Sequence, residues 1–412
     1  MEPLSLFQNS FQRFFFLSLF ILLFSFNTFL EYKSYKEFQK NEVIQIDATI
    51  LNIYKKNSYN VLKLKHKNFT FFTSITKKNS FKQLQQINLY IITQKISFIE
   101  YLKGFYTKSF NHRVLQNKTT LKTILFNSIS NQHSNTTIGS LYSALFLATN
   151  ISPTLREFTT NYGIAHLVAI SGFHIGIISA LLYFLFHLFY KPIHQKYFPY
   201  RNKKFDILIV VSFTLLGYLI LLDFVPSLLR AFTMFLFGIF LLRSNIKLLS
   251  FETLLIIVLI ILALFPKLLF SLSLWFSVAG VFYIFLFIQY FKNYNKYIQI
   301  IFFNLWIFLA INPIVHYFFT TTSFEQLYSP LLTIAFTVFY PIVVFLHLID
   351  FGNVFDSILL HWQYIEVFTF TKDTSLWFFL FYILVSFLSI TQKKAFITLN
   401  LLMVGFSFYL FI

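Results

Sequence analysis

One apolar stretch of the chain carries polar and small side chains where a simple membrane anchor has none. Residues 161–190 read NYGIAHLVAISGFHIGIISALLYFLFHLFY, and from Ile164 onward they are long and apolar enough to cross a bilayer. The first half of this stretch holds five candidate functional residues: His166, Ser171, Gly172, His174 and Gly176. Polar groups in hydrocarbon cost insertion energy and usually face a protein interior or a water-filled path. The stretch is therefore the first candidate for a functional site.

These side chains allow two kinds of chemistry, hydrolysis and metal binding, but each set of residues is incomplete. Ser171 between His166 and His174 is similar to a nucleophile with its base, but no acidic residue in the stretch orients a histidine. A membrane-embedded hydrolase is therefore the weaker alternative, and we expect no catalytic residue and no enzyme. Two histidines without cysteine or carboxylate form an incomplete ligand set, so we also expect no metal and no cofactor.

The same residues predict how this helix is built. Gly172 and Gly176 form a small-xxx-small step that lets another backbone approach closely. On a continuous helix, His166 and His174 would lie about 80° apart and line one groove. Ser171-Gly172 is also a place where we expect the helix to kink or break.

The composition places this stretch in a polytopic membrane protein. Of 412 residues, 57% are hydrophobic and 22% are aromatic, which exceeds the usage of soluble globular proteins. Apolar stretches of about 18 or more residues predict an α-helical membrane protein with about 9–11 transmembrane or re-entrant helices. The first, Phe14 to Leu30, has no small-residue cleavage site, so residues 1–30 are predicted to stay as a transmembrane helix. The chain has no cysteine, which excludes disulfides, Fe–S clusters and thiol catalysis.

Residues 31–115 are polar and differ from the rest of the chain. Alternating apolar residues predict five strands, the last of them weaker: 44–50, 61–65, 69–75, 87–93 and 96–101. Five short strands in about 70 residues fit a small barrel such as an OB-fold, which often binds single-stranded nucleic acid. We therefore predict a small N-terminal all-β, OB-like domain.

Positive charge concentrates in the same segment. The net charge of the chain is +18, and residues 31–122 hold 17 basic against five acidic residues, a balance of +12. A solvated lysine-rich surface is one explanation, and a contact surface for DNA phosphates is the other. The candidate DNA-binding lysines are Lys55, Lys56, Lys63, Lys65, Lys67, Lys77 and Lys78. The aromatic residues that are candidates to stack on bases are Tyr54, Tyr59, Phe69, Phe71 and Phe72.

Residues 116–162 are helical in pattern but too polar to span a membrane. An interfacial amphipathic helix is predicted by apolar residues that recur on one face: Leu121, Ile124, Leu125 and Ile129. Ser152-Pro153 supplies the N-cap and the first residue of a second helix, and Gly163 ends it. Residues 163–412 form the remaining transmembrane domain.

Charged loops predict the membrane topology. The basic loop from Lys191 to Lys204 is cytoplasmic by the positive-inside rule. Counting helices back from this loop puts the β domain outside the cytoplasm, where its positive charge opposes the usual bias and favours a binding role. Lys393-Lys394 is also expected in the cytoplasm. An odd number of crossings must then lie between Lys296 and Asp350, although two apolar stretches occur there. Phe324 to Leu348, interrupted by Pro330 and Pro341, is therefore predicted to be partly re-entrant, and three crossings are the alternative.

Three motifs resemble those of the ComEC competence family, inner-membrane proteins that bring transforming DNA into bacteria. The run from His166 to His174, HLVAISGFH, is similar to the main family pattern. The pair Arg230-Ala231 is similar to a second motif, and Leu272-Ser273-Leu274-Trp275-Phe276 to a third. The chain departs from the family at Ala148-Thr149-Asn150, where a Gly-Asp-Arg-like turn is usual, and it lacks the Asp often found before Pro266.

The resemblance implies a channel of the bacterial inner membrane that translocates single-stranded transforming DNA into the cytoplasm. The residues it implies for the channel are His166, Ser171, Gly172, His174, Gly176, Arg230 and Ser273. Arg230 is expected either to line the conduit or to pair with Asp223 as a scaffold. A small-molecule or lipid transporter is the main rival, because it shares intramembrane polar residues but does not require a basic β domain.

The resemblance also implies partners. Many family members continue into a metallo-β-lactamase-like nuclease domain, whereas this chain ends at Ile412 without a His-x-His-x-Asp-His run. A nuclease, a DNA receptor and a cytoplasmic motor are therefore expected to be separate proteins. Single-stranded DNA and membrane lipids are the expected ligands, and a homo-oligomer stays an open alternative.

Overall fold

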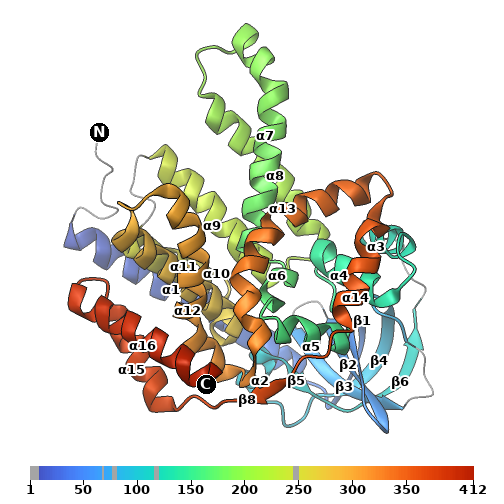
Figure 1. Cartoon of the computed structure of the whole chain (residues 1–412). Coiled ribbons are helices and arrows are strands. Elements are labelled where there is room, and N and C mark those ends of the chain that lie inside the picture. Colours follow the sequence, from blue (N-terminus) through green and yellow to red (C-terminus); the bar gives the residue numbers. More distant parts are fainter. Residues whose placement is uncertain (1–8, 67–68, 77–80, 116–119, 245–249) are drawn as a thin grey trace. The chain divides into compact units, whose positions relative to one another are not determined.

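The computed structural model describes residues 9–66, 69–76, 81–115, 120–244 and 250–412 (Figure 1). These residues form two compact units. The first, here called the β unit, ends at Ser128 and includes residues 257–272. The second, the helical unit, comprises residues 129–256 and 273–412.

The β unit opens with a long helix and continues as a sheet. Helix α1 (Ser10–Phe38) has 29 residues and contains the predicted transmembrane segment. The strands are β1 (Val43–Lys55), β2 (Tyr59–His66), β3 (Phe69–Thr76), β4 (Gln86–Ile92), β5 (Phe105–Tyr106) and β6 (Ser109–Val114). They hydrogen-bond in the order β5-β3-β2-β1-β4-β6, with β3 and β5 parallel and the other pairs antiparallel.

The sheet closes into a barrel at its two edges. β5 and β6 are the edge strands, yet only Thr107 and Lys108 separate them in the chain. The Thr107 amide donates to the Phe72 carbonyl of β3 at 2.9 Å. The Ile92 amide of β4 donates to the Lys108 carbonyl at 3.3 Å. Counted as one interrupted strand, β5 and β6 complete a five-stranded barrel, which agrees with the predicted OB-like architecture.

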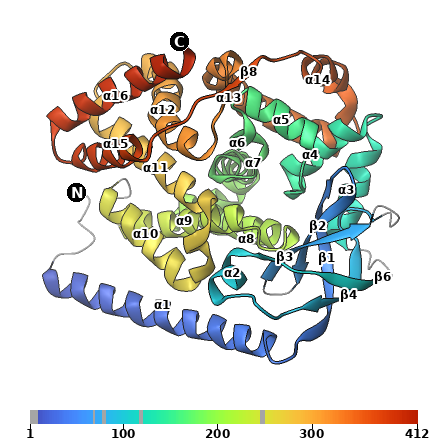
Figure 2. The same ribbon diagram turned by 90° about the horizontal axis from the view of Figure 1, so that it is seen from below.

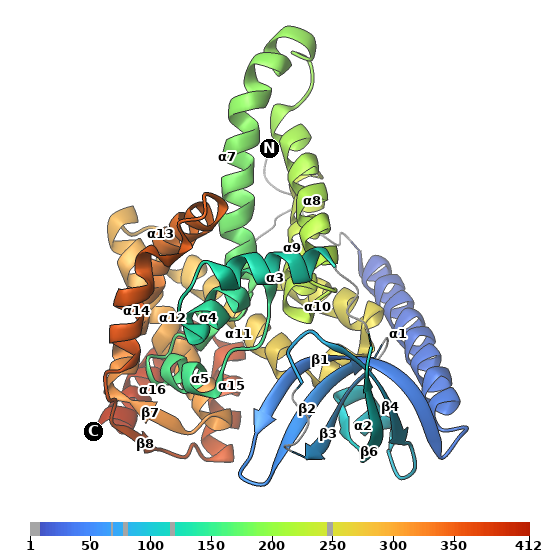
Figure 3. The ribbon, with the colours of Figure 1, turned by 90° about the vertical axis from the view of Figure 1, so that its right-hand side faces the viewer.

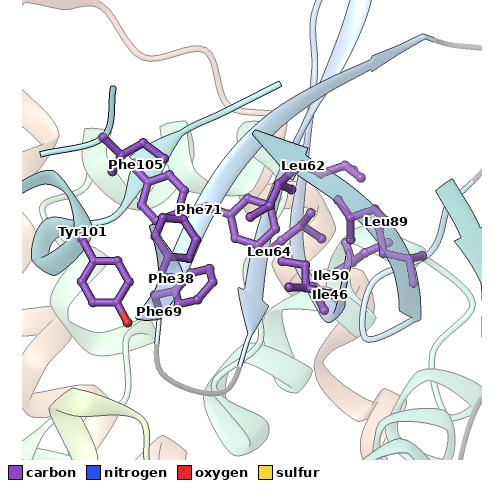
Figure 4. Close-up of a cluster of buried hydrophobic side chains, with 14 of the residues drawn as sticks. Phe38, Ile46, Ile50, Leu62, Leu64, Phe69, Phe71, Leu89, Tyr101 and Phe105 are labelled. Carbon is purple, nitrogen blue, oxygen red and sulfur yellow. The ribbon is translucent and has the colours of Figure 1, made fainter. Parts of the chain in front are cut away.

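Alternation along the strands fills the barrel. In β3, Phe71 and Ile75 point inward and are almost fully buried, whereas Phe72 between them is only half-buried. Ile50, Leu62, Leu64 and Leu89 are fully buried in the same core (Figure 4). One end of the barrel is packed with aromatic rings, among them Phe38 from α1 and Phe69, whose centroids lie 5.1 Å apart. The alternation of side chains along each strand therefore decides which aromatic residues fill the core and which face outward.

The prediction of a strand at residues 96–101 is wrong. This segment enters helix α2 (Phe98–Lys103), which begins with a capping box: Ser97 Oγ accepts from the Glu100 amide, and the Glu100 carboxylate accepts from the Ser97 amide. These hydrogen bonds from Ser97 lower the pKa of Glu100. The real fifth strand follows the helix, as β5 and β6.

The helical unit consists of helices joined by short connections. They are α4 (Thr136–Leu147), α5 (Pro153–Asn161), α6 (Ala165–Val168), α7 (Gly172–Tyr197), α8 (Lys203–Leu221), α9 (Pro226–Arg243), α11 (Leu272–Phe291), α12 (Lys296–Phe318), α13 (Ser329–Leu348), α14 (Asp356–Gln363), α15 (Leu376–Leu388) and α16 (Lys393–Phe411). Helices α3 (Leu121–Asn131) and α10 (Phe251–Leu264) each contribute residues to both units. Figure 3 shows α7 and α8 running side by side as an antiparallel pair.

The described residues confirm the membrane class. Seven segments are long and apolar enough to cross a membrane: α1, α7, α8, α11, α12, residues 324–348 and α16. Helices α4, α10 and α15 are shorter but also apolar. The chain is thus a polytopic α-helical membrane protein with a small β domain. On the predicted interfacial helix, α3, Leu121 and Ile124 are exposed.

Helices α11, α12, α15 and α16 share one aromatic core (Figure 2). Tyr290 and Phe396 stack with ring centroids 3.7 Å apart. Trp306 is almost fully buried and donates to Asn400 Oδ1 at 2.8 Å, so its one polar atom is satisfied. The Tyr382 hydroxyl donates to the Ala310 carbonyl at 2.7 Å. Each buried aromatic residue that carries a polar tip here finds a partner, which fixes the packing of these helices.

The two ends of the segment from residue 324 to residue 368 are held together by strand pairing. Strand β7 (Thr321–Ser323) before it pairs with β8 (Thr369–Thr371) after it. Helix α13 is the only helix of this described segment that is long enough to span a membrane. The pairing therefore favours the re-entrant alternative over three crossings. The prediction that prolines interrupt the helix is wrong, because Pro330 occupies the first turn of α13, where no amide is needed, and Pro341 lies inside a continuous helix.

The barrel register makes neighbouring phenylalanines on β3 unequal. Phe71→Ala should leave a cavity and destabilise the protein by about 3–5 kcal/mol. Phe72→Ala, its matched control one residue away, should cost much less because this ring faces outward. Thermal unfolding of the two purified full-length variants in detergent measures the difference. Equal losses would mean that the register is wrong.

Candidate functional site

The candidate stretch is two helices, as the predicted break at Ser171-Gly172 requires. Helix α6 ends at Val168, and α7 begins at Gly172 with Ser171 as its extended N-cap, φ −136° and ψ 179°. The Ser171 amide donates to His174 Nδ1 at 3.3 Å, so the third residue of α7 closes the first turn. Since the helix is not continuous, the angle of about 80° between its histidines does not apply.

The two histidines lie close enough to interact electrostatically, but they differ in exposure. His174 is fully buried, and its ring meets Tyr340 edge-on at 4.9 Å and Phe336 at 5.5 Å, both from α13. His166 on α6 is exposed. Ser171 Oγ also lies 3.3 Å from His174 Nδ1, but His174 Nε2 has no hydrogen-bond partner among the described residues. A triad orients its histidine with an acidic side chain, and none acts on His174 among the described residues.

The glycines serve another purpose than the close backbone contact predicted for them. A Cβ built on Gly172 would lie 3.8 Å from Ala231 Cβ, which is ordinary side-chain contact. A Cβ on Gly176 would meet no described atom within 4 Å. At Gly172 the start of α7 packs against α9 beside Arg230. Two motifs separated by nearly sixty residues therefore meet.

The third motif joins them through a side-chain hydrogen bond. Arg230 is only 5% exposed, and its Nη2 donates to Ser273 Oγ on α11 at 3.2 Å. The predicted scaffold partner of Arg230 was Asp223, but the structure directs the guanidinium to Ser273 instead. Ser171-Gly172, Arg230-Ala231 and Ser273 thus form one site near the N-terminal ends of α7, α9 and α11, which we call the three-helix site.

A clamp that the sequence did not reveal holds the chain leading into this site. Three buried side chains near the start of α13 donate to carbonyls at the C-terminal end of α5 and just beyond it. Ser323 Oγ donates to Asn161, Gln326 Nε2 to Thr160 (3.3 Å) and Ser329 Oγ to Gly163 (3.0 Å). Ser152 caps α5 as predicted, and Gly163, at φ +65°, ends it in the left-handed region. The polar run at residues 320–329 in an apolar domain was the available signal.

A second buried polar cluster lies in the helical unit. His133 Nδ1 contacts the Asp356 carboxylate at 2.9 Å, and His133 Nε2 lies 3.1 Å from His347 Nε2. His347 Nδ1 lies 2.6 Å from the Val343 carbonyl, which only accepts, so this nitrogen carries a hydrogen. A carboxylate likewise requires a hydrogen on His133 Nδ1. The three side chains thus form one continuous set of contacts from Asp356 through His133 to His347.

Aromatic rings and a glycine enclose this cluster. Tyr142 stacks on His133 at 4.7 Å, and burial, reinforced by the Asp356 carboxylate, raises the pKa of Tyr142. Gln132 Nε2 donates to the His347 carbonyl at 3.2 Å, and Gln132 Oε1 accepts from the Gly352 amide at 3.0 Å. No sequence pattern pointed to these residues, because the cluster joins positions more than two hundred residues apart.

On the β unit, the outer face of the barrel carries a mixed basic and aromatic patch. Lys63, Phe72 and Tyr106 are direct cross-strand neighbours on β2, β3 and β5. Lys63 Nζ lies 5.8 Å from the Phe72 centroid, and Tyr54 lies 6.5 Å from the same ring. The Tyr106 hydroxyl is 2.7 Å from Ser74 Oγ. These four residues, Tyr54, Lys63, Phe72 and Tyr106, are called the barrel patch.

The structure divides the predicted DNA-binding residues. Phe69 and Phe71 are buried in the barrel core, so their assignment as base-stacking residues is wrong. Tyr59 is exposed, as are Lys55 and Lys56, and Lys63 and Lys65 are half-buried. Lys67, Lys77 and Lys78 lie outside the described residues. Tyr106, which the sequence reading missed, is 56% exposed.

Comparison with known proteins identifies one relationship. A family model described as Competence protein matches residues 148–412, well over half of the chain. No curated protein and no solved structure matches the chain. The matched region contains all the motifs of the three-helix site, together with the clamp.

Gly352 tests the tight packing around the histidine cluster. A Cβ at this position would lie 2.8 Å from His347 Nε2 and would also collide with Gln132 Oε1. Gly352→Ala should therefore destabilise the protein by about 1–3 kcal/mol. The control, Gly217→Ala in α8, has no described atom within 4 Å of its new Cβ and should be neutral or stabilising. Thermal unfolding in detergent compares them, and a neutral Gly352→Ala would contradict this packing.

Proposed function

The chain belongs to the competence protein family, and from this premise we propose that it is the channel through which single-stranded transforming DNA crosses the bacterial inner membrane. Family membership assigns the protein a role in DNA uptake during competence. Its span-length helices make it a multi-pass membrane protein. The inner membrane, the single-stranded form of the DNA and a position of the β unit outside the cytoplasm are parts of the proposal.

The barrel patch is the observation that supports this proposal most. It sets aromatic faces and a lysine on adjacent strands of an OB-like barrel, the arrangement used by proteins that bind single strands without sequence preference. Phe72 and Tyr106 offer ring faces to bases, and Lys63 offers its ammonium to the phosphate that connects them. The +12 balance of residues 31–122 adds an attraction that does not depend on sequence.

In this proposal the helical unit carries the strand onward past the three-helix site. The connection between α5 and α7 is irregular backbone in an apolar unit, which is tolerated where it is enclosed by protein or lines a water-filled cavity. The clamp holds the Gly163 carbonyl at its start, and Ala165, His166 and Ala169 are exposed along it. If this connection lines a hydrated path, as we propose, it suits a charged polymer better than a closed helix bundle does.

A separate DNA receptor, a nuclease and a cytoplasmic motor are the proposed partners of this channel. The rival function is transport of a lipid or small molecule. It shares the irregular connection but leaves the barrel patch without a role. A hydrolase is the least supported alternative because no acidic side chain acts on His174 among the described residues, and Ser171→Ala is expected to keep DNA uptake.

The barrel patch should bind single-stranded DNA directly. In the full-length protein in nanodiscs, Phe72→Ala should weaken binding of labelled oligothymidylate about tenfold, because one stacked base contributes about 1–3 kcal/mol. The matched control is Phe110→Ala, which removes an exposed ring on β6 outside the patch and should change affinity less than about twofold.

Salt dependence separates stacking from charge in the same assay. Lys63→Gln should reduce the slope of log affinity against log salt by about 0.7, the contribution of one phosphate contact on a single strand. Equal losses in the Phe72 and Phe110 variants, or no binding at low salt, would contradict the proposed DNA role. Binding is read as fluorescence anisotropy.

Uptake in cells tests the channel itself. In a strain without this gene, labelled transforming DNA should bind the cell but stay outside the cytoplasm, because the crossing step is missing. Complementation with the wild-type chain should restore cytoplasmic label. Complementation with Phe72→Ala should restore much less, at equal membrane abundance. Cytoplasmic label in the deletion strain would reject the channel role and favour the transporter.

A further inference from the structure

Arg230 carries a buried positive charge that the described protein does not neutralise. Only 5% of the residue is exposed, and one nitrogen, Nη2, is hydrogen-bonded, to Ser273 Oγ. Its Nε and Nη1 atoms are buried and have no hydrogen-bond partner among the described residues. A guanidinium has five N–H donors, no acceptor, and stays charged in proteins. Four of its five N–H groups are therefore not used by Ser273.

No carboxylate of the described residues compensates this charge. Ion pairs among the described residues join His133 to Asp356, Arg201 to Asp206 and Lys267 to Glu31. None of them includes Arg230. A buried charge without a counter-charge is strongly destabilising, so a residue of this kind usually has a partner that completes it.

Helix ends around Arg230 increase the positive potential instead of reducing it. Ser273 is the second residue of α11, a helix of 20 residues, and Gly172, which contacts Ala231, is the first residue of α7, a helix of 26 residues. The first N–H groups of a helix have no intrahelical acceptor, and the macrodipole is positive there. A cation is disfavoured at such a place, whereas an anion is favoured.

The hydrogen bond between Arg230 and Ser273 leaves donors on both partners. Ser273 Oγ accepts from Nη2, so its own hydroxyl hydrogen remains available to donate. Ser273 is exposed, although the guanidinium behind it is buried. A ligand that enters from the Ser273 side meets a set consisting only of donors, and an ionised oxyanion is the group that satisfies such a set.

We propose that Arg230, the Ser273 hydroxyl and the first N–H groups of α11 form a phosphate-binding site. The inference deepens the proposed function and rests on it for the identity of the phosphate, which is then a phosphodiester of the passing strand. A phospholipid headgroup offers the same chemistry and is the other source. A tetrahedral phosphate accepts hydrogen bonds from several directions, which matches donors contributed by two helices.

The test for the site uses dimethyl phosphate, a phosphodiester without a base or a lipid tail. It should raise the unfolding temperature of the detergent-purified full-length protein in a saturable way, because a ligand that binds only the folded state stabilises it. Arg230→Gln should raise the Kd at least tenfold, Ser273→Ala should raise it several-fold, and Arg230→Lys should keep part of the binding. Arg243→Gln, at the exposed far end of α9, is the control and should leave the Kd unchanged.

Two results would overturn the site: no saturable response of the wild type, or an equal response of Arg230→Gln. If Arg230→Gln does not fold, Ser273→Ala and Arg230→Lys decide by the same measurement. DNA uptake by the Arg230 and Ser273 variants, and the phosphatidylglycerol they retain after purification, then identify the source of the phosphate. Loss of uptake at normal abundance supports the DNA strand, and loss of bound lipid with normal uptake supports the headgroup. If the wild-type protein binds dimethyl phosphate but does not support DNA uptake in cells, the proposed function is rejected and the phosphate site stands.

Discussion

Unpaired backbone groups between α5 and α7 are the constraint on which the helical unit depends. A helix that stops and restarts leaves carbonyls and amides without intrahelical partners, and an unsatisfied buried group costs about 1–3 kcal/mol. The clamp residues Ser323, Gln326 and Ser329 satisfy the carbonyls. Where α7 begins, the Ser171 amide is satisfied by the His174 ring. The break is therefore a supported feature of the native state.

The same constraint explains the segment that follows α12. Its clamp residues must stay near the break, and the pairing of β7 with β8 fixes them by joining both ends of residues 324–368. The far end of this segment is held by the cluster of His133, His347 and Asp356, with Gln132 and Gly352 packed around it. Polar contacts at both ends keep α13 beside α7, where Phe336 and Tyr340 cover the ring of His174.

The β unit solves the equivalent problem by closure. An open sheet leaves edge amides and carbonyls that attract other chains, but the connection through Thr107 and Lys108 pairs both edges of this sheet. The interior is then filled by alternate residues of every strand, so the outer face is free to carry polar and aromatic groups. Lys63 and Arg230 illustrate two uses of a cation. Lys63 lies over the Phe72 ring at the surface, whereas Arg230 is buried and has no counter-charge among the described residues.

The sequence by itself determined features that depend on neighbours within a few residues. Apolar length predicted the membrane class, alternation predicted β1 to β4, Ser152-Pro153 and Gly163 bounded α5, and Ser171-Gly172 marked the break. Alternation failed at residues 96–101, where the capping box of Ser97 and Glu100 favours a helix. Only the tertiary structure decided that Arg230 bonds Ser273, that Phe72 faces outward while Phe71 is buried, and that His133 meets His347. These contacts join residues on different elements, and the packing of whole helices and strands, which no local pattern records, brings them together.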